Sequence, residues 1–206
     1  MPESLKQIIS ITVVLIVVFV AYYGTYLPYQ KSHAFIVTLG SKIESLATFK
    51  EKFSEVLDVP SPIGQPEIMR NITNTALSVL DQLNDAEAIQ SVVSYIEGRH
   101  RPLTVGNRGM SFLQDLYVLG TMNELAFVKT QELRYAEAAK KYFLEGYAVN
   151  PTRPQFAYAL FDIYRIENNV EKAKEMAEHI LKLWPTEEKI PKLLEDFLNR
   201  QLTETR

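Results

Sequence analysis

Residues 149–185 read VNPTRPQFAYALFDIYRIENNVEKAKEMAEHILKLWP, and this stretch has the apolar spacing of two consecutive helices. Leu160 and Tyr164 lie four positions apart in its first half, and Ala173 and Ala177 lie four positions apart in its second half. Side chains at this spacing share one face of a helix. The stretch therefore predicts a helix-turn-helix unit that ends at its final proline.

The segment before this unit repeats its pattern. Five positions align at a separation of 34 to 35 residues: Leu125, Tyr135, Ala138, Tyr142 and Pro151 with Leu160, Val170, Ala173, Ala177 and Pro185. A one-residue insertion before the first proline absorbs the difference. A unit of this length resembles the tetratricopeptide repeat, in which a small residue lets the second helix approach the first and a proline ends the second helix. We therefore expect an all-α chain with a tetratricopeptide-like helical-repeat domain, an α-solenoid.

Two residues depart from the tetratricopeptide pattern. Phe161 stands where that repeat usually has glycine, and Ile180 stands where it usually has alanine. These larger side chains predict a slightly different helix spacing. An ordinary helical bundle with accidental spacing is the alternative.

An uncharged apolar run lies near the N-terminus. Residues 8–23 read IISITVVLIVVFVAYY, and the run extends to Leu27 before Pro28, which we expect to end the helix. About 20 such residues cover a hydrocarbon core roughly 30 Å thick. Tyrosines, which favour the water interface, cluster at one end of the run: Tyr22, Tyr23, Tyr26 and Tyr29. The run predicts a single transmembrane anchor, with residues 8–27 in contact with lipid.

A cleaved signal peptide and a buried core helix are the alternatives to an anchor. No small-x-small cleavage triplet follows the run, and a core helix usually carries a polar stripe. Basic residues flank the run on both sides, Lys6 before it and Lys31 and Lys42 after it. The positive-inside rule therefore gives almost no preference for either orientation. The short N-terminal tail favours a membrane protein whose domain lies outside the cytoplasm.

Composition limits the classes of partner. The 206 residues include 22 Lys and Arg against 25 Asp and Glu, a net charge of −3, and no cysteine. There is no basic stripe of the kind that binds nucleic acid, so we expect no nucleic-acid partner. Apolar residues recur three and four apart over long segments, which favours an all-helical chain.

Between the anchor and the repeats, the spacing predicts three helices and two breaks. We expect one helix over residues 33–57, a break over 60–66, a helical pair over 67–83 and 86–97 with Asp85 as N-cap, and a second break over 99–109. The helical pair could be a further, degenerate repeat. The predicted divisions are the anchor with its tail (1–30), a helical region (31–109), two repeats (110–187) and a capping helix (188–206).

Four quoted stretches carry a resemblance to a known family. In order they are YLPYQKSHAFI (26–36), ESLATFKEKFSEVL (44–57), GQPEIMRNITNTAL (64–77) and the repeat unit at 149–185. This order resembles the C-terminal portion of bacterial O-antigen ligase and polymerase-like membrane proteins. The resemblance implies a last membrane helix followed by a tetratricopeptide domain outside the cytoplasm. The family's glycan chemistry lies in its multi-span part, which this sequence lacks, so no catalytic residue carries over.

The sequence offers no catalytic motif. Its three histidines, His33, His100 and His179, lie in different segments without metal-ligand spacing. There is no Gly-x-Ser-x-Gly elbow and no phosphate loop. We therefore expect no catalytic, cofactor-binding or metal-binding residue and no small-molecule substrate. One basic cluster, residues 99–101, could meet a lipid head group, a phosphate or an acidic partner, or could simply lie in solvent at a helix end.

The predicted function is protein recognition by a membrane-anchored repeat domain. First-helix positions 5, 9 and 12 of tetratricopeptide repeats face the concave side, which predicts these partner-binding residues: Asn123, Phe127, Thr130, Tyr158, Asp162 and Arg165. Phe127 and Tyr158 could instead pack against upstream helices. Two other functions stay open: an accessory subunit or separated C-terminal part of a cell-surface glycan ligase or polymerase system, and a structural subunit of a filament or membrane supercomplex.

Overall fold

The chain is helical throughout the part that the structure describes. The computed structural model describes residues 2–43, 45–104 and 109–204, and every regular element in these ranges is a helix. The all-α prediction is therefore confirmed for those residues. The chain divides into two compact units, Met1–Ala76 and Leu77–Arg206.

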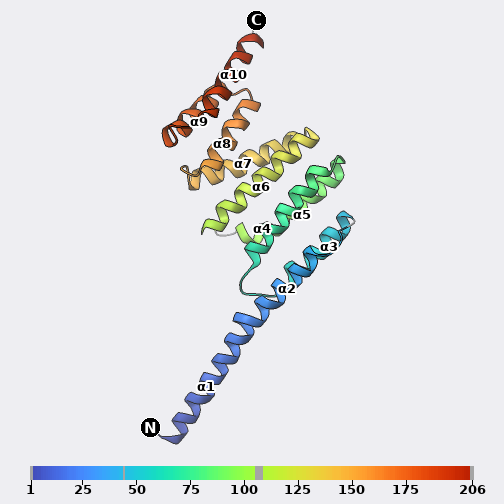
Figure 1. Cartoon of the computed structure of the whole chain (residues 1–206), viewed down its shortest axis with the longest axis vertical. Helices are drawn as coiled ribbons and strands as arrows, with labels where there is room; N and C mark the ends of the chain where they lie inside the picture. The colour runs from blue at the N-terminus through green and yellow to red at the C-terminus, as the bar shows by residue number, and fades with distance from the viewer. Residues whose placement is uncertain (1, 44, 105–108, 205–206) are drawn as a thin grey trace. The chain divides into compact units, whose positions relative to one another are not determined.

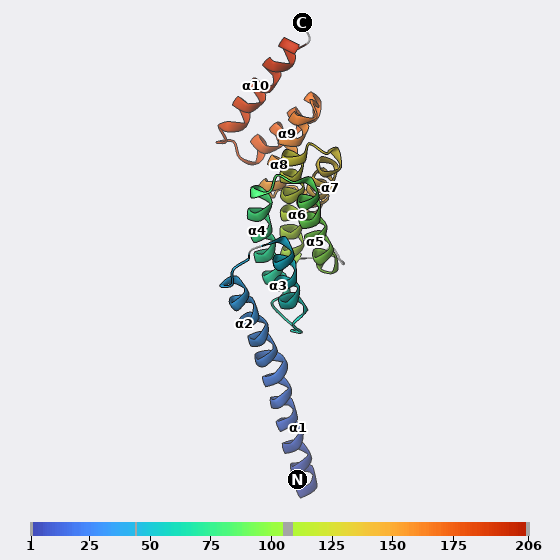
Figure 2. The ribbon, with the colours of Figure 1, turned by 90° about the vertical axis from the view of Figure 1, so that its right-hand side faces the viewer.

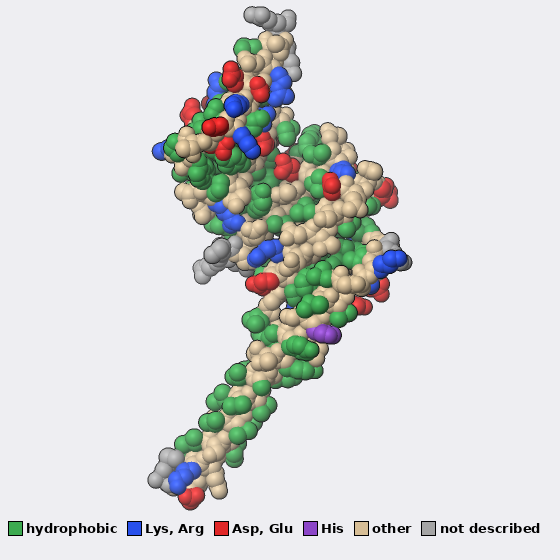
Figure 3. All heavy atoms as spheres, in the orientation of Figure 1, with side chains coloured by type: hydrophobic (Ala, Val, Ile, Leu, Met, Phe, Trp, Pro, Cys, Tyr) green, Lys and Arg blue, Asp and Glu red, His purple; other side chains and the backbone are tan. Residues whose placement is uncertain are grey.

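The first unit begins with a long helix (Figure 1). It consists of α1 (Glu3–Ala21), the π-helical turn η1 (Tyr22–Tyr26) and α2 (Leu27–Leu39). Hydrophobic side chains cover α1, and acidic and basic side chains lie at its N-terminal end (Figure 3). The helix is long and apolar enough to cross a membrane, and no residue of its most apolar stretch is buried.

Pro28 does not end this helix, contrary to the sequence prediction. In η1 the backbone widens, so that the Leu27 N–H donates to the carbonyl of Tyr22, five residues back. Proline has no N–H, and in an α-helix its ring meets the carbonyl four residues before it. A π-helical turn just ahead of Pro28 relieves that clash, and the helix continues as α2.

The predicted helix over residues 33–57 is also wrong, because the chain reverses within it. α2 ends at Leu39, and α3 spans Leu46–Asp58 and packs against α2. The side chain of Ser45 accepts a hydrogen bond of 3.1 Å from the Thr48 N–H, which caps the start of α3. At its other end, the buried Lys31 ammonium donates to the carbonyls of Leu57 (3.2 Å) and Val59 (2.7 Å).

The helical pair predicted for residues 67–97 is present. α4 spans Gln65–Gln82, and α5 spans Ala86–Thr104. Asp85 caps α5 as predicted, because its carboxylate accepts a bond of 2.8 Å from the Ala88 N–H. α5 continues past the predicted break at Arg99 to Thr104. Residues 105–108 of that break lie outside the described residues.

The second unit is a series of helices in which each packs on the next (Figures 1 and 2). After α5 come α6 (Gly109–Thr130), α7 (Leu133–Val149), α8 (Pro154–Ile166), α9 (Val170–Leu183) and α10 (Lys189–Glu204). Two hairpins turn at residues with positive φ, Gln131 (59°) after α6 and Asn168 (56°) after α8. Asparagine and other short polar residues tolerate this left-handed conformation better than branched ones.

The buried positions of the two hairpins correspond at a separation of 34 residues. Fully buried pairs with this separation include Met122 with Phe156, Ala126 with Leu160, Ala139 with Ala173 and Phe143 with Ala177. The predicted alignment of Leu125 with Leu160 and of Ala138 with Ala173 was therefore wrong by one residue. The separation of 34 already relates Pro151 to Pro185, so the prolines had the correct register.

Two glycines of this unit lie directly beneath phenylalanine rings of the next helix. A Cβ on Gly120 of α6 would lie 2.3 Å from the Phe143 ring of α7, and a Cβ on Gly146 of α7 would lie 2.2 Å from the Phe156 ring of α8. These distances are far inside van der Waals contact. Each phenylalanine ring therefore occupies a notch that only glycine leaves open, and the notches fix α6, α7 and α8 against one another.

Candidate functional site

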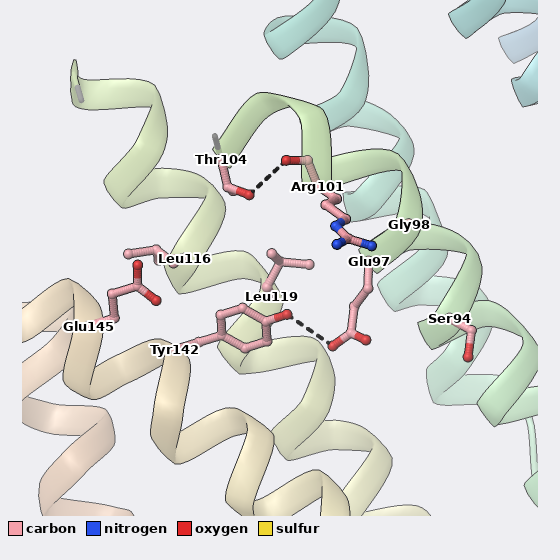
Figure 4. Close-up of a pocket in the computed structure, with 9 residues that line it drawn as sticks. All are labelled: Ser94, Glu97, Gly98, Arg101, Thr104, Leu116, Leu119, Tyr142 and Glu145. Carbon is pink, nitrogen blue, oxygen red and sulfur yellow. Dashed lines mark hydrogen bonds between the residues drawn. The ribbon is translucent and has the colours of Figure 1, made fainter. Parts of the chain in front are cut away.

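A cavity in the second unit lies among α5, α6 and α7 and has a volume of about 460 Å³. Figure 4 shows the Tyr142 hydroxyl pointing at Glu97, to which it donates a hydrogen bond of 3.2 Å. The same carboxylate oxygen accepts a bond of 2.9 Å from the Asn123 amide. Burial and then the charge of Glu97 raise the pKa of Tyr142. The hydrogen bonds among these three side chains join α5, α6 and α7, so we assign the cluster a structural role.

A second hollow, which we call the α6–α8 groove, consists of three cavities that share Glu124. Their volumes are about 400, 340 and 30 Å³. The two larger cavities also share Asp162. Since α6 and α8 are the first helices of the two hairpins, the groove runs along equivalent faces of successive units.

Glu124 is the exceptional residue of the groove. Its carboxylate is partly buried, and within the described part of the chain it accepts no hydrogen bond and forms no ion pair. Burial and then the charge of Asp162 raise its pKa. A buried carboxylate normally has a partner, because transfer from water is costly without one. The groove therefore holds a charge that the described residues leave uncompensated.

Asp162 and Arg165, both predicted site residues, pair with each other along α8. The Arg165 Nη1 donates to the Asp162 carboxylate at 2.8 Å, and the guanidinium lies 5.2 Å from the centre of the Phe161 ring. The Nε of Arg165 is buried and makes no hydrogen bond to any described residue. Asp162 is thus already partly neutralised, whereas Glu124 is not.

Tyr158 forms a wall of the groove and also holds the segment after α9. Its hydroxyl donates a hydrogen bond of 2.6 Å to Glu187, and its ring centre lies 6.3 Å from that of Trp184. Burial, together with the bond to Glu187, raises the pKa of Tyr158 to about 12. This tyrosine therefore packs and lines the groove at the same time.

The structure separates the three predicted residues of the first repeat. Asn123 is fully buried and faces Glu97 of α5, away from the groove. Phe127 lines the smallest of the three groove cavities. Thr130 is engaged at the end of α6, because its hydroxyl donates to the carbonyl of Ala126 at 2.8 Å.

Sequence reasoning missed Glu124, Tyr117 and Thr121, all of which line the largest groove cavity. The signal that finds Glu124 is the 34-residue separation of the core, because 34 residues before Tyr158 is Glu124 and not Asn123. The one-residue error in register therefore replaced Glu124, which lines the groove, by its fully buried neighbour Asn123.

The basic cluster at residues 99–101 does not present three cations together. His100 is buried with its Nδ1 3.7 Å from a carboxylate oxygen of Asp115, and Arg101 is exposed. The Arg99 guanidinium lies 5.7 Å from the centre of the Tyr95 ring. The cluster thus divides between a core pair on one side of α5 and solvated arginine on the other.

Among residues 2–43, 45–104 and 109–204, no group of three His, Cys, Asp or Glu side chains is arranged to hold a metal ion. Comparison with known proteins adds no assignment: no protein-family model, curated protein or solved structure matches the chain significantly.

Proposed function

We propose that this chain is a single-pass membrane protein whose helical unit of residues 77–206 is tetratricopeptide-like and binds another protein through the α6–α8 groove. The observation that carries the proposal is the uncompensated carboxylate of Glu124 in a groove between the first helices of two successive hairpins. Charged groups of this kind are stabilised when a partner supplies the missing interaction.

The composition of the long N-terminal helix supports the membrane anchor. Large aliphatic side chains from Ile8 to Val20 are at least 46% exposed, which is unfavourable in water and favourable in lipid. Tyr22 and Tyr26 stack with ring centres 5.7 Å apart, just past the apolar segment. Amphipathic rings at that position suit the boundary between hydrocarbon and water.

The tetratricopeptide-like assignment rests on the repeat geometry. Two consecutive helical hairpins have core positions 34 residues apart, and each buries a small residue in its second helix, Ala139 and Ala173. The first helices of stacked units line a concave surface in such repeats. α6 has 22 residues and α8 has 13, so the two units are unequal in length.

The composition of the groove supports recognition as its role. Tyrosine and arginine side chains, which are enriched in protein interfaces, line it alongside small residues and carboxylates. Tyr117 and Tyr158 contribute aromatic walls, and Arg165 lies beside Asp162. Side chains that are only partly buried keep area available to a partner.

Affinity capture with the full-length chain tests the proposal. Tagged wild-type protein is solubilised from membranes, and captured proteins are quantified against Glu124→Gln and against Glu137→Gln, which alters an exposed carboxylate of α7. We expect a partner that Glu124→Gln loses at least tenfold and that Glu137→Gln retains. A partner captured equally by all three proteins would move the binding site away from the groove.

A further inference from the structure

We propose, on the premise that the α6–α8 groove binds a protein, that its ligand is a peptide segment with a lysine or arginine side chain next to a small aliphatic residue. The basic side chain would lie against Glu124, and the aliphatic one would enter the small apolar cavity beside it.

The charge of the largest groove cavity favours a cation, because Glu124 and Asp162 are the charged residues that line it. The cavity of about 340 Å³, in contrast, also holds Arg165 and Arg200. Glu124 and Asp162 are close enough for the charge of Asp162 to raise the pKa of Glu124, and only Asp162 has an ion-pair partner in the described part of the chain. A bound anion would add a third negative charge to this pair. A bound cation would compensate the buried carboxylate and relieve its repulsion from Asp162.

The walls of the largest groove cavity suit a long basic side chain. Tyr117 of α6 and Tyr158 of α8 both line the cavity that holds Glu124. Lysine and arginine lay their alkyl stems along apolar surface while the charged head finds an acceptor. Aromatic faces also attract such cations. Thr121 and Gln155 line the same cavity and can bond the peptide backbone.

The smallest groove cavity sets the second preference. It measures about 30 Å³ and is bounded beside Glu124 chiefly by apolar side chains, including Phe127, Ala139 and Ile163. This volume is about that of one water molecule in the liquid, and an apolar lining favours a methyl group over water. The methyl group of alanine next to the basic residue fits this space, whereas valine, leucine and aromatic side chains are too large for it.

Arg200 of α10 is a cation that could compete from within the chain. It lines the same cavity as Glu124 and Asp162, and its Nε donates a long hydrogen bond, 3.4 Å, to the carbonyl of Asp196. If the groove recognises a cation, Arg200→Ala leaves binding unchanged or tightens it. If the groove recognises an anionic ligand, Arg200→Ala weakens binding and overturns the proposal.

The direct experiment uses a library of acetylated and amidated hexapeptides with the full-length chain in detergent micelles. Peptides retained by wild-type protein are sequenced, and one of them is labelled with fluorescein for anisotropy titration. We expect lysine or arginine beside alanine. We also expect that norleucine in place of the basic residue, or Glu124→Gln in the protein, raises Kd at least tenfold. The two changes together should raise Kd little more than either alone, because they remove the same interaction.

The outcomes separate this inference from the proposed function. Retained peptides without a basic residue, or peptides that bind Glu124→Gln as tightly as wild type, overturn the cation preference. If Ala159→Arg, which fills the largest groove cavity, abolishes the binding of those peptides, the protein-binding proposal still stands. If no hexapeptide is retained and no protein is captured from membranes, both proposals fail.

Discussion

At the scale of single residues, Gly120 and Gly146 matter because of what lies over them. Glycine in the interior of a helix is unfavourable relative to alanine by roughly 1 kcal/mol. Both glycines are buried beneath phenylalanine rings, which come to within 2.3 and 2.2 Å of where a Cβ would lie. The close packing that this allows compensates for the lower helix propensity.

Gly146→Ala should therefore destabilise the second unit by about 1–3 kcal/mol, the usual cost of overpacking a core. Thermal unfolding followed by circular dichroism should give a lower Tm. Gly98→Ala is the matched control, because nothing lies within 4 Å of the added Cβ in the interior of α5. The control should raise Tm or leave it unchanged. A Gly146→Ala protein as stable as wild type would mean that the Phe156 ring moves aside freely.

Glu124→Gln should stabilise the fold at neutral pH even though it removes binding. The pKa of Glu124 is raised in the folded state, so ionisation costs more there than in the unfolded chain. This cost is absent at pH values below the ordinary glutamate pKa of 4.5, grows as pH rises above that value, and is complete once pH exceeds the higher folded pKa. The Tm difference between Glu124→Gln and wild type should thus be positive at pH 7 and vanish near pH 4. A negative difference at pH 7 would indicate that Glu124 has a stabilising partner.

The sequence led to Asn123 because the repeat was aligned on apolar residues that two neighbouring registers satisfy almost equally. Leu125 and Ala126 are both apolar, as are Ala138 and Ala139, and only burial distinguishes them. The absence of a partner for Glu124 is a property of three-dimensional packing, so no pattern in the sequence could reveal it. Tyr158 and Asp162, in contrast, were predicted in the better repeat and both line the groove.

At the scale of helices, ends were harder to predict than faces. The apolar spacing over residues 33–57 continues through the reversal between α2 and α3, although only α3 buries the side that the pattern marks. Ile36 and Leu39 of α2 are exposed. The signals for the reversal were local: Gly40 after α2, and Ser45 as the N-cap of α3. α4, α8 and α9 gave clearer boundaries, since proline or asparagine stands close to their ends.

Lys31→Met should loosen the carboxyl end of α3. The Lys31 ammonium donates hydrogen bonds to two carbonyls there. A hydrogen bond to a charged group contributes about 1.5–3 kcal/mol to stability, and the substitution removes both bonds. Hydrogen exchange of the amides in Leu46–Asp58 should accelerate. Glu55→Gln, which changes an exposed side chain of the same helix, should leave exchange unaltered. Equal exchange rates in both variants would mean that contacts other than those of Lys31 hold the end of α3.

At the scale of the whole molecule, apolar side chains have two different environments. In the second unit many of them are buried in one cluster that runs from Phe112 to Phe197, whereas those from Ile8 to Val20 are exposed along α1. The sequence predicted that one apolar helix would differ from the amphipathic helices, because an uncharged run and a periodic amphipathic pattern are distinct signals. It did not predict how far the helix extends beyond the apolar run, since that depends on the π-helical turn before Pro28.

Charges placed in the middle of α1 should release the protein from membranes. Val14→Arg combined with Val17→Arg costs about 2.5–3.5 kcal/mol for each arginine at the centre of a bilayer. Full-length wild-type protein should remain in the membrane pellet after alkaline washing, and the doubly charged variant should appear in the supernatant. Val14→Leu with Val17→Leu is the control and should behave as wild type. Wild-type protein in the supernatant would contradict the anchor.

α7 packs against both helices that line the groove and fixes the distance between them. One of its faces reaches α6 where Phe143 covers Gly120, and the other reaches α8 where Gly146 receives Phe156. Because both contacts are steric, they set the clearance between α6 and α8. Phe143 also lines the largest groove cavity, so the width of the groove depends on a residue inside it as well as on the two glycines. A wider or narrower slot could be obtained at positions 120 and 146 with Glu124 and both tyrosine walls kept as they are.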